Sequence, residues 1–189
     1  VAMFSNNAAI IVKSQPEIVS NIGSTVSNSP PAIDVPTIEN RIHELINQQR
    51  SNNGLSALSY DSSLVTIARK HSADMAQNNY FSHYNLQGLG PTERGGKVGY
   101  SCYKTYGSYY TTGIAENIEQ NNLYTSVTYY NGIPRYDWNT QEELAQSIVT
   151  GWMNSPGHRQ NILTPTYDRE GIGLAIASDS KVYITEDFC

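Results

Sequence analysis

The spacing of apolar and polar positions along the chain predicts three amphipathic helices. The first begins at Thr37 and ends at Asn52-Asn53-Gly54. The second follows Asp61, a residue type that caps helix N-termini, and the third begins near Gln141 within the capping box Thr140-Gln141-Glu142-Glu143. The side chains expected on the buried faces are Ile38, Ile42, Leu45 and Ile46; Leu64, Val65, Ala68, His71, Ser72, Met75 and Ala76; and Leu144, Ala145, Ile148, Val149, Trp152 and Met153.

Strands are predicted between and after these helices. The candidates are residues 114–119, 124–130, 171–177 and 181–188, and the last two are joined by a turn at 178–180. Residues 84–113 read as a loop because eight Gly or Pro residues interrupt them, with one short helix over 92–98. This order favours an α+β fold with helices packed on an antiparallel sheet over a repeated βαβ unit.

The composition divides the chain and limits its partners. Residues 1–36 are rich in Ser, Asn and Pro without a sustained period, which predicts a flexible tail or stalk ahead of a domain over 37–189. The net charge is −5 and no basic stripe occurs, which argues against nucleic acid and anionic membranes as partners. The apolar run at 8–12 is too short to span a bilayer, so no transmembrane segment is expected.

The chain has two cysteines, Cys102 and Cys189. They can form one disulfide, which would close a long loop and hold the last strand, or remain free thiols. The Ser-, Asn- and Tyr-rich composition is typical of secreted proteins and favours the disulfide.

The four histidines differ in their predicted surroundings. His43 lies off the apolar stripe of its helix and is expected to be solvated, whereas His71 lies on a buried stripe and is expected to be a core histidine. His83 and His158 each follow a helix end, in FSH and SPGH, where loops often carry function. In the second case, Ser155 is placed to cap a new turn with Pro156 at its first position.

One carboxylate, Glu116, interrupts the apolar stretch IAENI. Taken alone, this pattern favours a side chain that faces solvent. Two imidazoles and a carboxylate are nevertheless a set of ligands suited to zinc, and three protein ligands with an open position are typical of catalytic sites. The spacing alone does not bring His83, Glu116 and His158 together.

Five ordered motifs, IARKHSADM, FSH, AENI, GWMNSPGHRQNIL and GIGLA, resemble those of the CAP superfamily of cysteine-rich secretory, antigen 5 and pathogenesis-related 1 proteins. The similarity covers 37–189 and is greatest to single-domain microbial members. It implies a three-layer α-β-α sandwich with a central antiparallel sheet and an open cleft, in a protein that is secreted or held at the cell surface.

The resemblance also implies a divalent-metal site of modest affinity, most suited to zinc. His83 and His158 would bind the metal, and Glu116 would hold a metal-bound water. Animal and plant members carry another glutamate three residues after the helix tryptophan. Here that position is Ser155, so the implied site keeps two histidines and one glutamate.

Three functions fit these observations. The first is a binding module, assumed monomeric, for a small apolar or lipid ligand, a glycan, or an extracellular protein or cell-wall component. The second is a metal-dependent peptidase or esterase with Glu116 as general base, or a weaker Ser-His variant using Ser82 or Ser155. Glu186 would add an acid to such a site if it faced the cleft. The third is a purely structural or adhesive ectodomain. Fold-level analogy favours binding over catalysis.

Overall fold

The computed structural model describes residues 4–5, 8–13 and 29–189. Most of the predicted tail therefore lies outside the described residues, and the boundary at residue 36 stays a prediction. Two short described pieces of that segment pair with the rest of the chain. Strand β1 (Phe4–Ser5) lies parallel to β6, and β2 (Ala9–Lys13) lies parallel to β7.

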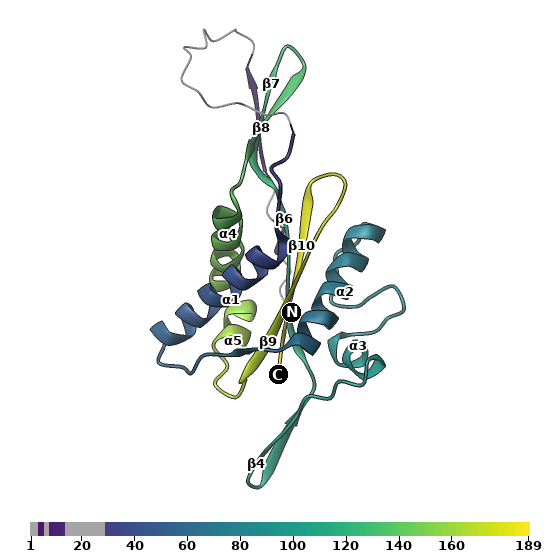
Figure 1. Cartoon of the computed structure of the whole chain (residues 1–189), viewed down its shortest axis with the longest axis vertical. Coiled ribbons are helices and arrows are strands. Elements are labelled where there is room, and N and C mark those ends of the chain that lie inside the picture. The colour runs from purple at the N-terminus through teal and green to yellow at the C-terminus, as the bar shows by residue number, and fades with distance from the viewer. Residues whose placement is uncertain (1–3, 6–7, 14–28) are drawn as a thin grey trace.

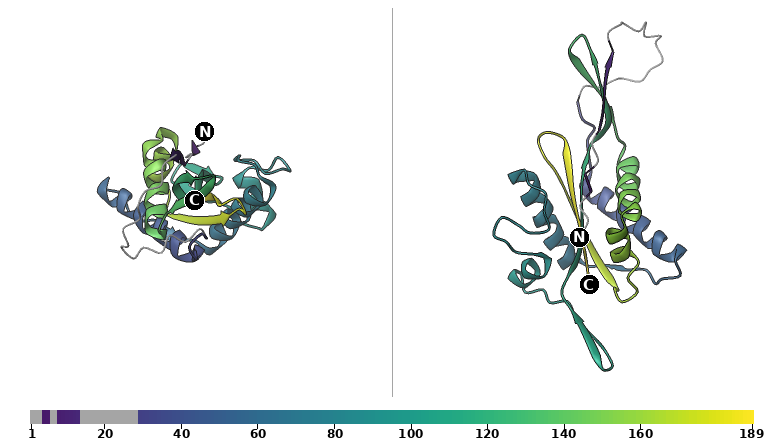
Figure 2. Two further views of the ribbon diagram at one scale, coloured as in Figure 1. Left: turned by 90° about the horizontal axis from the view of Figure 1, so that it is seen from above. Right: turned by 180° about the vertical axis from the view of Figure 1, so that it is seen from behind.

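Helices cover both faces of a five-stranded sheet, as Figure 1 and the end-on view in Figure 2 show. On one face lie α1 (Val35–Asn52), α4 (Gln141–Asn154) and α5 (Pro156–Ile162); on the other lie α2 (Ser62–Asn78) and α3 (Pro91–Lys97). This layering confirms the predicted α-β-α sandwich. The three long helices confirm the amphipathic pattern, and Asp61 and Thr140 cap α2 and α4 with their side chains.

The centre of the sheet is antiparallel, as predicted. Strand β10 (Lys181–Phe188) pairs on one side with β6 (Ala115–Asn122) and on the other with β9 (Arg169–Ile176). At the edges, β1 and β3 (Ser59–Tyr60) add short parallel pairs. The main core lies between this sheet and α1, α4 and α5, and the fully buried Trp152 is its largest side chain.

Helix α2 rests directly on the backbone of β9. A Cβ atom added to Gly171 would lie 2.1 Å from the backbone nitrogen of Val65, and one added to Gly173 would lie 2.1 Å from that of Arg69. Ser72 Oγ also donates a 2.8 Å hydrogen bond to the Gly173 carbonyl. Only glycine permits this close approach of helix and strand.

We predict that Gly173→Ala destabilises the protein, because the backbone atoms in its path belong to a packed helix. The expected loss in the free energy of unfolding is about 3 kcal/mol, the upper part of the range for overpacked cores. Gly96→Ala in α3 is the matched control, since a Cβ atom there meets nothing within 4 Å. Urea denaturation of both variants tests this, and equal stabilities would contradict it.

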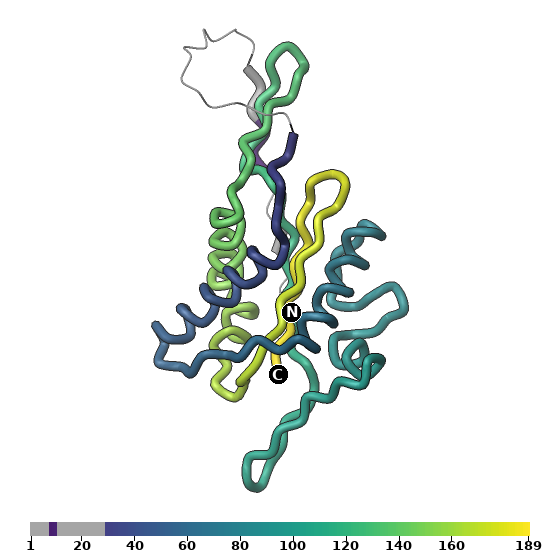
Figure 3. Tube along the Cα trace, viewed as in Figure 1, coloured from purple at the N-terminus to yellow at the C-terminus, as the bar shows by residue number. Residues whose placement is uncertain are grey.

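Two β-hairpins extend from opposite ends of the molecule (Figure 3). The first is β4 (Tyr103–Tyr106) with β5 (Tyr109–Thr112), in a segment that the glycine pattern predicted to be a loop. The second is the predicted strand β7 (Tyr124–Tyr130) with β8 (Ile133–Trp138), which was not predicted. Cross-strand aromatic pairs account for the first hairpin: the rings of Tyr103 and Tyr110 stack at 5.2 Å.

Cys102 and Cys189 form a disulfide, which confirms the predicted bridge. Both cysteines are buried, and they pack with Leu64, Ile67 and Ile114 in a small cluster below α2. The bridge joins the start of the β4–β5 hairpin to the last residue of the chain.

Candidate functional site

His83 reaches the site through a sharp reversal of the chain after α2. The helix ends at Asn78, and the capping residue Asn79 adopts the left-handed backbone conformation with φ of 51°. His71, about two turns before the end of α2, donates to the carbonyl of Ser82 through Nε2 at 2.9 Å. This bond confirms His71 as a buried, hydrogen-bonded core histidine and fixes the segment that carries His83.

Glu116 lies at the start of β6 and is buried, so the solvent-facing reading of AENI is wrong. The cause is a set of partners that the local pattern does not reveal. Glu116 Oε1 accepts a 2.8 Å hydrogen bond from His83 Nδ1, and Glu116 Oε2 pairs with the guanidinium of Arg94. Arg94 Nη1 also donates to the His83 carbonyl at 2.7 Å. Glu116, His83 and Arg94 therefore form one buried network.

A second carboxyl group, Asp187, joins this network from β10. It stands opposite Glu116 in the antiparallel register, so both side chains leave the sheet on the same face. Burial raises the pKa of Glu116 to about 7 and that of Asp187 well above its ordinary value. Because Arg94 pairs with Glu116 and not with Asp187, Asp187 is the more readily protonated of the two carboxyl groups.

His158 is held against the same end of β6 by α5. This helix begins at Pro156 with Ser155 at the N-cap position, which confirms the predicted turn, although the serine side chain makes no capping hydrogen bond. Asn117 Nδ2 donates to the His158 carbonyl at 3.2 Å, and Asn161 Nδ2 donates to Asn117 Oδ1 at 2.9 Å. His158 itself is buried.

The three predicted site residues line one cleft of about 510 Å³. Its other walls come from the segment after α2, the start of α3 and the first turn of α5. The lining residues are Ser82, His83, Tyr84, Pro91, Ala115, Glu116, Gly157, His158, Gln160 and Asn161. The cleft opens beside the edge of β6, between the two helical layers.

The side chains fit a metal ion only in part. Within the described part of the chain, no three His, Cys, Asp or Glu side chains are grouped closely enough to hold one. Both oxygens of Glu116 already have partners, which leaves it to orient His83 rather than to bind a metal. His83 has the properties of a metal-binding histidine. A carboxylate fixes its Nδ1–H, and its buried Nε2 has no hydrogen-bond partner among the described residues.

The protonation state of His83 supports this reading. Burial, with a smaller contribution from the Arg94 charge, lowers its pKa to about 4. The imidazole is therefore neutral at pH 7, the form that binds divalent metals.

Glu186 does not face the cleft. Its Oε2 accepts a 3.0 Å hydrogen bond from Asn117, and it lies on the sheet face covered by α1, next to the buried Glu170. The prediction of a solvated His43 is also wrong. His43 Nδ1 contacts Glu170 Oε1 at 2.5 Å and its side chain is only 20% exposed, because α1 turns this position toward the start of β9.

Arg94 and Asp187 are the site residues that sequence reasoning missed. Arg94 lies in the segment TERGGK, which was predicted as a short helix without a functional role. The only local feature that marks Arg94 is its place next to Gly95, which is tightly packed in the structure. Asp187 is recognisable only once β10 is paired with β6, because the register sets it opposite Glu116.

Comparison with known proteins gives a consistent result. The model of the cysteine-rich secretory protein family, CAP, matches residues 43–188. The uncharacterized protein YkwD of Bacillus subtilis is 32% identical over 151 residues, which are 79% of this chain and 46% of YkwD. The chain thus spans less than half the length of this relative.

Solved structures share the fold. An outer surface protein of Borrelia burgdorferi superposes with a TM-score of 0.61 at 19% identity, covering 82% of this chain and 94% of that one. An extracellular protein of Bacillus anthracis that contains an SCP domain gives 0.57 at 24% identity, covering 82% and 40%.

Proposed function

The chain belongs to the cysteine-rich secretory protein family, and we propose that it is an extracellular binding module whose cleft holds a divalent metal ion on His83 and His158. The observation that carries this proposal is the state of His83, a neutral imidazole whose Nε2 faces no protein partner among the described residues. Imidazole nitrogens favour zinc over the harder divalent cations.

Each residue of the network has a distinct task in this proposal. His83 and His158 would bind the metal, and water would complete its coordination. Glu116 would keep His83 in the tautomer that leaves Nε2 free, and Arg94 would hold Glu116 in its charged form. A bound metal would supply a Lewis-acidic centre for an oxygen-containing group of a partner, such as a glycan, lipid headgroup or protein side chain.

Binding is favoured over hydrolysis by the state of Glu116. A general base needs a free oxygen within reach of the attacking water, and both oxygens of Glu116 are bound to His83 and Arg94. The extracellular setting is supported by the disulfide and by the B. anthracis relative, which is described as extracellular. No helix within the described residues is long and apolar enough to cross a membrane.

Zinc is expected to raise the melting temperature of the wild type. At a free concentration of 100 times Kd the stabilisation is about 2.7 kcal/mol, which for a chain of this size is a shift of roughly 5–10 °C. The double variant His83→Ala with His158→Ala should lose this shift. His43→Ala, which removes a histidine outside the cleft, should keep it.

Differential scanning calorimetry with zinc, and with magnesium as a comparison, measures these shifts. Equal zinc shifts in the wild type and in the double variant would show that the metal binds elsewhere and would overturn the proposed site. A shift retained by His83→Ala alone would overturn the role of its Nε2.

A further inference from the structure

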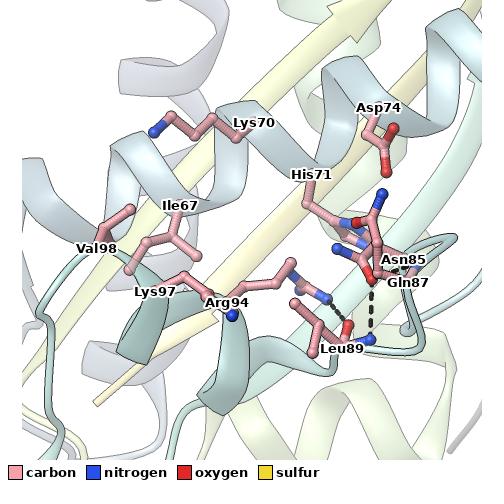
Figure 4. A pocket seen from close by; sticks show the side chains of 10 residues that line it. All are labelled: Ile67, Lys70, His71, Asp74, Asn85, Gln87, Leu89, Arg94, Lys97 and Val98. Carbon is pink, nitrogen blue, oxygen red and sulfur yellow. Dashed lines mark hydrogen bonds between the residues drawn. The ribbon is translucent and has the colours of Figure 1, made fainter.

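A hollow of about 550 Å³ lies between α2 and α3 (Figure 4). Two buried polar atoms in its lining, His71 Nδ1 and Arg94 Nε, have no hydrogen-bond partner among the described residues, but both are closed to solvent. A ligand in the hollow could not reach them, so they do not define a site there. The described surface offers a better-defined site on the β4–β5 hairpin, which extends away from the layered body (Figure 1).

The β4–β5 hairpin presents aromatic and hydroxyl side chains and almost no charge. Residues 103–112 include four Tyr, three Thr and one Ser, and their only charged residue is Lys104. Lys104 Nζ pairs with Asp168 Oδ2 at 2.9 Å and also donates to the Thr166 carbonyl at 3.0 Å. The hairpin therefore offers a partner aromatic rings and hydroxyl groups without an unpaired charge.

The two faces of the hairpin have different surroundings. The strand register separates the residues of one face, which we call the outer face, from those of the other: Tyr103, Thr105, Tyr110 and Thr112 against Lys104, Tyr106, Tyr109 and Thr111. The second face is attached to the segment before β9, because the Tyr106 hydroxyl donates to the Thr166 carbonyl at 2.9 Å. The four side chains of the outer face are exposed and make no hydrogen bond with the described residues.

Tyr103 and Tyr110 form a preorganised aromatic surface on the outer face. Their ring centroids are 5.2 Å apart, the ring planes lie at 27° to each other, and the two residues are 55% and 61% exposed. Because the rings pack on each other across the strands, they lose little conformational freedom when a partner binds. Exposed aromatic surface of this kind marks an interaction site.

The size and charge of the outer face determine which partner fits. The exposed parts of Tyr103 and Tyr110 amount to roughly 250 Å², well below the ~800 Å² that each side of a stable protein complex buries. The outer face alone is therefore too small to hold a folded protein, including a second copy of this chain. An anionic polymer or lipid headgroup would find no unpaired cation on the hairpin. A neutral sugar chain fits, because its C–H groups pack on ring faces and its hydroxyl groups bind those of Tyr and Thr.

We propose that the outer face of the β4–β5 hairpin is a binding surface for a neutral, β-linked polysaccharide. A β-linked chain is extended and carries C–H groups on its flat faces, which suits a pair of stacked rings. Hexose units would pack on Tyr103 and Tyr110, and Thr105 and Thr112 would bind hydroxyl groups of the chain. This surface needs neither the cleft nor a metal ion, so it stands independently of the proposed metal site.

The probes are cellohexaose and chitohexaose, titrated into the full chain by isothermal titration calorimetry. Both are neutral and β-linked, and the stronger binder shows whether the partner is a plain or an N-acetylated hexose chain. Maltohexaose, whose α-linkages curve the chain, should bind several-fold more weakly. A β-linked hexaglucuronate should also bind more weakly, because the net charge of −5 repels it and the hairpin has no unpaired cation. Equal or tighter binding of either comparison sugar would overturn the proposed partner.

Variants of the exposed tyrosines locate the binding surface. Tyr110→Ala should weaken both probes roughly fivefold, and Tyr103→Ala with Tyr110→Ala roughly thirtyfold, the loss expected for two stacked rings. Tyr103→Phe with Tyr110→Phe keeps the rings and should lose less than about fivefold.

Tyr109→Ala is the matched control on the same hairpin. Tyr109 is 58% exposed on the opposite face and stacks on Tyr106 at 5.1 Å, so its loss removes a similar cross-strand contact. This variant should bind both probes as the wild type does. Equal losses in Tyr109→Ala and Tyr110→Ala would show that binding depends on an intact hairpin rather than on the outer face, and would overturn the proposal.

The result does not depend on the metal site. His83→Ala with His158→Ala should bind both probes as the wild type does, so loss of zinc binding and loss of sugar binding are distinguishable. Absence of binding by both probes at millimolar concentration would overturn the proposal. Binding that the alanine substitutions at Tyr103 and Tyr110 leave unchanged would also overturn it.

Discussion

Reduction of the Cys102–Cys189 disulfide is expected to lower the free energy of unfolding by about 4–5 kcal/mol. The two cysteines are 87 residues apart, so the bridge removes a large loop from the unfolded ensemble. The bridge also holds Cys189 in place beside the start of β9, where its backbone exchanges hydrogen bonds with that of Arg169. A loss of this size is a large fraction of the stability of a domain.

Urea denaturation of the wild type with and without a thiol reductant measures this difference with identical side chains in both samples. The variant Cys102→Ser with Cys189→Ser is the control, because reductant should not change its stability. A difference below about 1 kcal/mol between oxidised and reduced wild type would contradict the entropic contribution assigned to the loop.

The elements that could be predicted are those whose signals are local. Helices α1, α2 and α4 carry an apolar stripe and a start or stop signal within their own residues. Strands β9 and β10 are short apolar runs around one turn. The β4–β5 hairpin and β8 lack such a signal, because their pairing depends on aromatic contacts across strands, Tyr103 with Tyr110 and Tyr124 with Trp138, rather than on an apolar face.

The candidate site likewise contains residues that could be predicted from the sequence and residues that could not. His83, Glu116 and His158 were placed in one cleft through the ordered motifs of a family, not through their spacing. The charged network around them comes from tertiary contacts: the strand register brings Asp187 to Glu116, and a seven-residue helix brings Arg94. Glu170 and Glu186 show the same limit on the opposite face, since nothing in their local sequence reveals that both are completely buried.

Arg94→Met is expected to destabilise the protein by about 3–5 kcal/mol at pH 8, because it leaves two buried carboxyl groups without their cation. Arg94 lowers the pKa of both Glu116 and Asp187 against the effect of burial. Without it, both groups are protonated in the folded state up to a higher pH. The substitution also leaves the carbonyls of His83 and Leu89 without a donor, a loss of about 1–2 kcal/mol that does not depend on pH.

The pH dependence separates these two contributions. A carboxyl group whose folded pKa lies above its unfolded value binds more protons in the native state. Its contribution to stability is therefore present at low pH and is lost as the pH rises through the folded value. For Glu116 this window runs from its ordinary value of 4.5 to about 7 in the wild type, and further upward in the variant. The difference between variant and wild type should shrink to about 1–2 kcal/mol at pH 5.

Urea denaturation at pH 5 and pH 8 tests this, with Arg41→Met as the matched control. Arg41 forms ion pairs with Glu44 and Glu142 at the surface, so its loss should cost less than about 1 kcal/mol at either pH. An Arg94→Met loss that is equal at both pH values would show that the carbonyl hydrogen bonds, not the carboxyl pair, depend on Arg94. In that case Glu116 would not need Arg94 to remain charged, and His83 would be oriented by a carboxylate that is stable on its own.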